Sequence, residues 1–218
     1  MRENTPFKTV RARTELCQSS EGGRKMANTI ITIGRQYGSG GRMVGIRLAE
    51  RLGIKCYNNE ILAEAVRESG LCKEVFERND EKPISAFLTF SAGKYDSGEM
   101  PLNHKVFLAQ MQTIRAIAER ESCVIVGRCA DYVLKDYKNV TNVFIHAPFE
   151  DRIKRVIERD GVVPGKAEKK VKKVDKERAA YYNFYSTKRW GAAETYDICL
   201  DSSRFGINKC ADIILALL

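Results

Sequence analysis

The sequence lacks the features that would place it in a membrane, in a disulfide-linked domain or around a structural metal. None of its apolar runs approaches the roughly 20 residues that span a bilayer, and no apolar signal core stands near its start. The seven cysteines are odd in number, scattered and free of any Cys-x-x-Cys pair. The two histidines, His104 and His146, have no suitably spaced partner for metal binding. These absences predict a cytoplasmic protein with no membrane partner and no protein-ligated metal.

Negative charge is also in deficit, because 37 Lys and Arg face 28 Asp and Glu and leave a net charge of +9. An excess of this size suits an anionic ligand, either nucleic acid or a nucleotide and a phosphorylated acceptor. The basic residues form no tract with interleaved aromatics, and the densest cluster, 166–176, contains Glu168 and Asp175. A mixed cluster of this kind is typical of a solvated helix face. We therefore expect nucleotides rather than nucleic acid as partners, and the sequence indicates no oligomeric state.

Strand-like and helix-like segments alternate along the chain from residue 28 onward. Short β-branched or apolar runs predict strands at 29–33, 54–57, 123–126, 142–145 and 196–200. Amphipathic spacing predicts helices at 42–52, 60–69, 72–78, 103–121, 150–159, 166–185 and 207–217. This alternation predicts an α/β fold, a three-layer doubly wound parallel sheet of about five strands. Residues 79–102 are expected to form a surface connection, and polar residues 1–27 a flexible arm before one domain at 28–218.

A glycine-rich segment, residues 34–42, joins the first strand to the first helix. Such a loop offers backbone N–H groups and a helix N-terminus to a phosphate. The dinucleotide pattern G-x-G-x-x-G would need glycine where Met43 stands. The strict P-loop pattern would need lysine at Gly41 and a hydroxyl residue at Arg42 or Met43. A glycine turn without a ligand is the plain alternative to a divergent phosphate loop.

Three segments, Ile31–Arg42, Leu52–Tyr57 and Val124–Asp131, resemble the cytidylate kinase-like family. The resemblance covers about residues 28–215 and implies a P-loop kinase-type fold with a helical lid at about 161–190. It implies transfer of a phosphoryl group from ATP, with Mg²⁺, to a nucleoside monophosphate, CMP or dCMP. Two alternatives stay open because the P-loop lysine, its hydroxyl and several lid arginines are absent. They are a kinase for another small acceptor and a nucleotide-binding module with little kinase activity.

The same resemblance implies roles for individual residues. Those expected to bind the ATP phosphates are Arg35, Gln36, Tyr37, Gly38, Ser39, Gly40, Gly41, Arg42 and Met43. Those expected to bind the acceptor are Asn58, Arg115, Arg128 and Asp131, and those expected in the lid are Lys173, Arg178, Lys188 and Arg189. Arg42, Arg128 and Arg178 are the expected catalytic residues, and Arg42 or Arg35 would replace the missing lysine. Mg²⁺ would be held mainly by phosphates and water. Ordinary surface roles are the alternative for Arg115 and the lid residues, and helix capping for Asp131.

Overall fold

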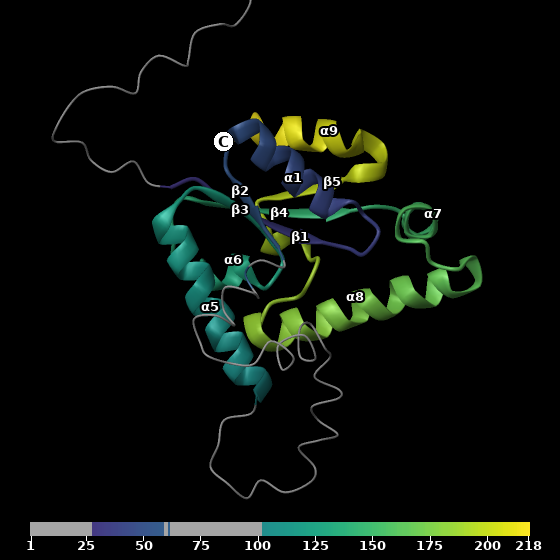
Figure 1. Cartoon of the computed structure of the whole chain (residues 1–218), viewed down its shortest axis with the longest axis horizontal. Coiled ribbons are helices and arrows are strands. Elements are labelled where there is room, and N and C mark those ends of the chain that lie inside the picture. The colour runs from purple at the N-terminus through teal and green to yellow at the C-terminus, as the bar shows by residue number, and fades with distance from the viewer. Residues whose placement is uncertain (1–27, 59–60, 62–101) are drawn as a thin grey trace, which may run out of the picture.

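The computed structural model describes residues 28–58, 61 and 102–218 (Figure 1). Four predicted segments fall almost entirely outside these residues: the arm at 1–27, the helices at 60–69 and 72–78, and the connection at 79–102. In the described part of the chain, strands and helices alternate as the sequence pattern predicts.

Five parallel strands form one sheet in the order β2-β3-β1-β4-β5. They are β1 (Ile30–Arg35), β2 (Lys55–Tyr57), β3 (Cys123–Val126), β4 (Val140–His146) and β5 (Ile198–Asp201). The central strand β1 places Ile33 opposite Val126 of β3 and Val143 of β4. The carboxyl ends of β1 and β3 therefore open at one edge of the sheet, where open α/β sheets bind ligands. The predicted parallel sheet of about five strands is confirmed.

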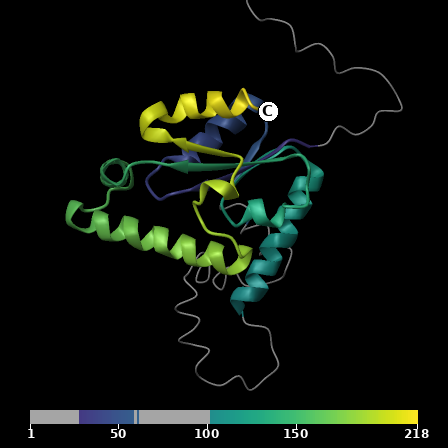
Figure 2. The ribbon, with the colours of Figure 1, turned by 180° about the vertical axis from the view of Figure 1, so that it is seen from behind.

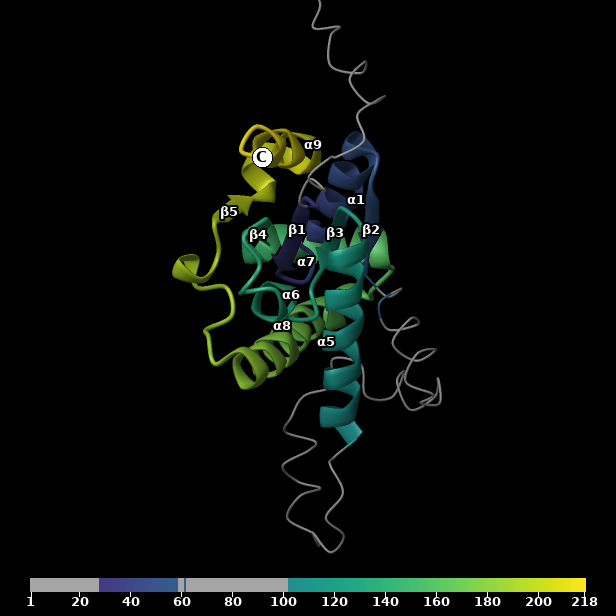
Figure 3. The same ribbon diagram turned by 90° about the vertical axis from the view of Figure 1, so that its left-hand side faces the viewer.

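Helices cover both faces of the sheet and complete three layers, as Figures 2 and 3 show from two further directions. One face carries α1 (Gly41–Leu52) and α9 (Ser202–Leu215). The opposite face carries α5 (Leu102–Arg120) and α6 (Ala130–Val133). Helix α7 (Phe149–Asp160) leads into the long helix α8 (Pro164–Ser186), which crosses below the sheet. No helix in this part of the chain is long and apolar enough to cross a bilayer.

The two faces of β1 feed two separate apolar clusters, because successive side chains of a strand point to opposite sides. The cluster under α1 and α9 includes Ile31, Ile33, Val44, Leu48 and Ile214. The cluster under α5 and α6 includes Ile30, Ile114, Ile117, Val133 and Leu134. Since β1 and β3 are buried from both sides, their carboxyl ends and the loops that follow them are held on a rigid base.

The structure contains two short helical segments that the sequence did not predict, α6 and the 3-10 helix η1 (Ala193–Thr195). Helix α6 follows Arg128 and Cys129, which both have positive φ angles of 60° and 53°. Non-glycine residues seldom adopt this conformation, so no sequence pattern announces the turn. Strand β5 also begins later than expected, because Tyr196 donates its backbone N–H to Ala193 and pairing with β4 starts at Ile198.

Glu121, between α5 and β3, accepts hydrogen bonds from three side chains at the edge of the sheet. The Tyr57 hydroxyl donates to it at 2.7 Å, Lys55 at 3.2 Å and Arg120 at 3.1 Å. These bonds, with that from Lys55 foremost, lower the pKa of Glu121 to about 2. The carboxylate therefore stabilises the fold at neutral pH and joins the edge strand β2 to the sheet's central part.

The low pKa of Glu121 predicts part of the acid sensitivity of the fold. Its folded-state pKa lies below the unfolded value of 4.5, so its contribution is complete above that pH and is lost as the pH falls towards 2. We expect Glu121→Gln to flatten the decline of the melting temperature over that interval, measured by circular dichroism. Glu50→Gln, at an exposed position of α1, is the control and should keep the wild-type slope. An unchanged slope in Glu121→Gln would contradict the prediction.

Candidate functional site

The glycine loop leaves the end of β1 and enters α1 with two residues in the left-handed region. Gly38 and Gly40 each have φ of +79°, and Gly40 is the N-cap of α1. A Cβ on Gly38 would lie 2.7 Å from the carbonyl oxygen of Arg152, and one on Gly40 would lie 2.6 Å from Cδ1 of Ile207. Glycine is therefore favoured at both positions by its conformation, and at Gly38 also by the close approach of the α7 backbone.

Tyr37, in the glycine loop, forms hydrogen bonds to residues of helices α7 and α8. Its hydroxyl donates to Asp160 Oδ2 at 2.8 Å, and its backbone N–H donates to Asp175 Oδ1 at 2.7 Å. Burial, followed by the bond to Asp160, raises the pKa of Tyr37 to about 12. Arg178 places its guanidinium carbon 5.7 Å from the centre of the Tyr37 ring. The loop and α8 are thus joined through one residue of the predicted phosphate-binding segment.

Two arginines of α7 complete the support of the loop. Arg152 donates to the carbonyl oxygens of Ala147 and Tyr37, each at 3.1 Å, and forms an ion pair with Asp175. Arg155 donates to the carbonyl oxygen of Ser39 at 3.3 Å and to Ser202 Oγ at 3.0 Å. The sequence analysis did not single out these arginines. Their spacing of three residues on α7 puts both on the face toward the loop, which only the packing of α7 identifies.

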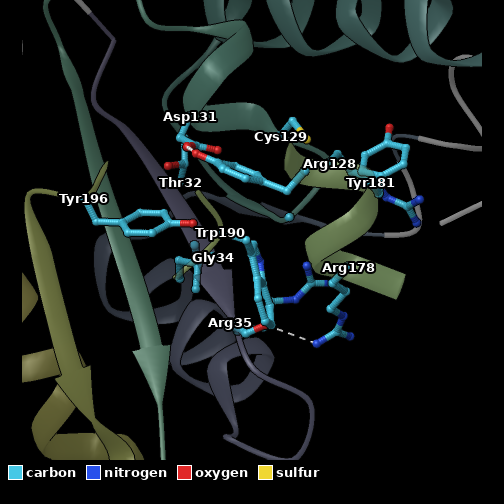
Figure 4. Close-up of a pocket in the computed structure, with 13 residues that line it drawn as sticks. Thr32, Gly34, Arg35, Arg128, Cys129, Asp131, Arg178, Tyr181, Trp190 and Tyr196 are labelled. Carbon is cyan, nitrogen blue, oxygen red and sulfur yellow. Dashed lines mark hydrogen bonds between the residues drawn. The ribbon is translucent and has the colours of Figure 1, made fainter. Parts of the chain in front are cut away.

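Two adjoining cavities lie at the carboxyl edge of the sheet. The larger, of about 570 Å³, extends over the glycine loop to Asn58 at the end of β2. The smaller, of about 30 Å³, lies between the end of β1, the turn before α6 and the carboxyl-terminal part of α8 (Figure 4). Three arginines line both cavities: Arg35, Arg128 and Arg178. The larger cavity is in the size range of small-molecule binding sites.

Arg128 is buried at the end of β3, in the left-handed region of the backbone. Burial is the main cause that lowers its pKa to about 10, and the charge of Arg35 adds to the effect. A buried guanidinium near a second cation is unfavourable in the empty protein and favours a bound anion. The strained turn at Arg128 and Cys129 is of the kind found at ligand-binding positions.

The smaller cavity combines a buried carboxylate with aromatic rings. Asp131 in α6 is buried, and the Tyr182 hydroxyl donates a hydrogen bond to its Oδ2. Burial raises the pKa of Asp131, and it also raises the pKa of Tyr182. Trp190 and Tyr196 also line this cavity, and a Cβ on Gly34 near the end of β1 would lie 3.1 Å from Cε1 of Tyr196 (Figure 4). The N-cap of α6 is Cys129, and Asp131 is the second residue of the helix.

Ser39 is buried and lines neither cavity. Other predicted site residues lie either along the larger cavity or at exposed positions away from both cavities. Arg42, Met43 and the buried Asn58 line the larger cavity, although Arg42 and Met43 are exposed at its rim. Four others are exposed and line neither cavity: Arg115, Lys173, Lys188 and Arg189. Lys173 lies 3.9 Å from Glu177 on its own helix. The roles assigned to these four residues stay predictions.

Arg159 and Asp160 also line the larger cavity, although the sequence analysis did not select them. They are the last two residues of α7 and precede Gly161, where the predicted lid begins. This position beside a glycine at the lid boundary was the available signal. The hydrogen bond from Arg159 lowers the pKa of Asp160, and the Tyr37 hydroxyl also donates a hydrogen bond to the Asp160 carboxylate. In the described residues no three His, Cys, Asp or Glu side chains gather to hold a metal ion.

The fold and the site define the class. A parallel sheet of order β2-β3-β1-β4-β5, with a glycine loop after the central strand and arginines along the cavity, is that of a P-loop kinase-type α/β protein. The chain matches the cytidylate kinase-like family over residues 30–204 and belongs to that family. The chain is accordingly a nucleoside monophosphate kinase-like phosphotransferase.

Individual relatives and solved structures are similar to this chain over most of its length. The cytidylate kinase of Methanopyrus kandleri is 27% identical over 199 residues, which are 87% of this chain and 92% of the relative. An uncharacterized protein of Eubacterium ventriosum is 33% identical in its crystal structure, with a TM-score of 0.67 over 87% of this chain and 98% of its own. A shikimate kinase of Bacteroides thetaiotaomicron shares the fold at 12% identity, with a TM-score of 0.51 over 87% and 97% of the two chains.

Proposed function

We propose that this chain transfers the γ-phosphoryl group of ATP to a nucleoside monophosphate, with CMP or dCMP as the acceptor. One observation carries the proposal. A single cavity extends from the glycine loop to Asn58, and Arg128 and Arg178 stand along it. An acceptor phosphate beside Arg128 and ATP phosphates on the loop would meet in this cavity. Phosphoryl transfer requires this kind of alignment and charge neutralisation more than it requires covalent chemistry.

The glycine loop would hold the ATP phosphates through backbone N–H groups. Gly38, Gly40 and Gly41 carry no side chains that could block this approach, and the N-terminus of α1 favours a negative charge. The residues fit a metal held by the nucleotide better than one held by the protein. Met43 offers no hydroxyl, and Asp160 already bonds to Arg159 and Tyr37. When bound, Mg²⁺ would supply charge neutralisation on the phosphate oxygens.

The buried Arg128 and the half-buried Arg178 would act on the phosphoryl group in transfer, and Asp131 would act on the base. Arg128 and Arg178 would stabilise the negative charge that spreads over the transferring phosphoryl group, since both line the two adjoining cavities. The Asp131 carboxylate would accept a hydrogen bond from the exocyclic amino group of cytosine. Arg115, Lys173, Lys188 and Arg189 are proposed as further contacts to the acceptor or from the lid.

An acceptor panel tests this proposal. Purified full-length protein would receive ATP and Mg²⁺ with CMP, dCMP, UMP, AMP or GMP in turn, and the diphosphate formed would be measured. We expect turnover with CMP or dCMP and little with AMP. ATP binding without turnover on any acceptor would instead support a nucleotide-binding module, which the absence of a lysine at Gly41 favours. Turnover restricted to a different small acceptor would overturn the proposed substrate and keep the kinase.

A further inference from the structure

Arg35, the last residue of β1, extends its side chain across two glycines that belong to different segments. Its Cβ and Cγ lie over Gly41, the first residue of α1, where a Cβ would be 2.5 Å and 3.1 Å away. Its guanidinium lies over Gly127 at the end of β3, where a Cβ would overlap Nη1. The arginine thus crosses from the glycine loop to the turn that carries Arg128.

The space over Gly41 explains why this position holds no lysine. Gly41 begins α1 and has no positive φ, so its backbone conformation allows any residue. What excludes a side chain is the Cβ of Arg35, which is bonded directly to the backbone and cannot swing away. In an ordinary P-loop a lysine starts at this position and reaches the phosphates. Here the side chain of Arg35 fills that space from the opposite side.

The position of the Arg35 guanidinium brings three cations to the junction of the two cavities. Arg35, Arg128 and Arg178 line both cavities, and the Arg178 guanidinium donates to the backbone oxygen of Arg35 at 3.2 Å. The charge of Arg35 disfavours the charged form of Arg128. Like charges brought together in this way create a strong positive potential, and a phosphate at the junction would relieve their repulsion.

We infer that Arg35 is the residue that replaces the P-loop lysine and binds the terminal phosphate of ATP beside Arg128. This inference rests on the proposed function and names the cation that its phosphate site uses. Arg42, the other candidate, is the second residue of α1 and is exposed at the cavity rim. A charge at an exposed rim is screened by solvent and contributes little, whereas the junction is enclosed by Arg128 and Arg178.

Binding of MgATP to four variants tests the inference, with calorimetry on the full chain and without an acceptor. Arg35→Gln keeps the stem over Gly41 and removes the charge, so affinity should fall at least about tenfold. Arg42→Gln should lose less than about threefold. Gly41→Lys should weaken binding at least about tenfold because its side chain meets Arg35. Arg35→Gly with Gly41→Lys removes that conflict, restores the ordinary lysine and should bind at least about fivefold more tightly than Gly41→Lys.

Arg47→Gln, on the exposed side of α1, is the matched control and should bind as the wild type does. Thermal unfolding checks that each variant is folded. Equal affinity of Arg35→Gln and wild type, or a larger loss in Arg42→Gln, would overturn the inference. If the wild-type protein does not bind MgATP, both this inference and the proposed function are overturned. If wild type binds MgATP but phosphorylates no monophosphate, the proposed function fails, and the Arg35 comparison still decides this inference.

Discussion

Replacement of Arg128 by glutamine is expected to reduce turnover by about 100- to 1000-fold, the usual cost of losing one preorganised hydrogen-bond donor to a transition state. Arg128 lines both cavities at the point where the two substrates would meet. Lysine should not restore activity, since a point charge does not reproduce the planar donor set of a guanidinium. The measurement is steady-state kinetics with CMP, with kcat and KM determined separately.

The same substitution should not weaken the fold. Burial lowers the pKa of Arg128, which means that its charge is less favourable in the folded protein than in the unfolded chain. We therefore expect Arg128→Gln to melt at the wild-type temperature or above it while activity is lost. Arg47→Gln is the control for removal of an exposed arginine and should leave kcat unchanged. Turnover within tenfold of wild type in folded Arg128→Gln would show that Arg128 does not act on the transferring group.

Replacement of Asp175 by alanine is expected to destabilise the protein by about 3 kcal/mol, the lower end of the range for breaking a buried ion pair. The Arg152 and Asp175 side chains are 8% and 17% exposed, and Asp175 also accepts the Tyr37 backbone N–H. Its removal leaves a buried guanidinium and a loop N–H without this acceptor. For a chain of this size the loss corresponds to a decrease in melting temperature of about 6–12 °C.

A surface pair on the same helix supplies the control for Asp175. Glu168 and Lys172 form an ion pair in α8 with side chains 60% and 63% exposed. Glu168→Ala should change stability by less than about 0.5 kcal/mol. The double variant Arg152→Met with Asp175→Leu should recover part of the loss, because it removes both buried charges. A melting temperature of Asp175→Ala equal to that of Glu168→Ala would exclude a stabilising role for the contact between α8 and the loop.

The order of elements was predictable because each one leaves a local pattern. The apolar run at Cys123–Val126 predicted strand β3 with the bounds that the structure shows. Gly53 correctly predicted the end of α1 at Leu52. Helix α6 was missed because four residues after two left-handed ones carry no period. The parallel sheet followed from alternation, whereas the strand order β2-β3-β1-β4-β5 depends on which strands pair across long separations.

The glycine loop itself was recognisable from sequence, because a strand, closely spaced glycines and a helix are contiguous. So was the absence at Gly41 of the lysine that an ordinary P-loop carries. The choice between Arg35 and Arg42 was not accessible in the same way. Both arginines flank the loop, but one side chain crosses Gly41 and Gly127 while the other is exposed.

The sequence by itself determined the class of fold, the position of the glycine loop and membership of a kinase family, because these depend on contiguous residues. Only the tertiary structure brought Arg35, Arg128 and Arg178 to one junction, from β1, β3 and α8. It alone set Asp175 against Tyr37 and Arg152. The reason is physical. Charge acts through distance in space, and Arg128 and Arg178 are separated by 93 and 143 positions along the chain from Arg35, with which they line both cavities.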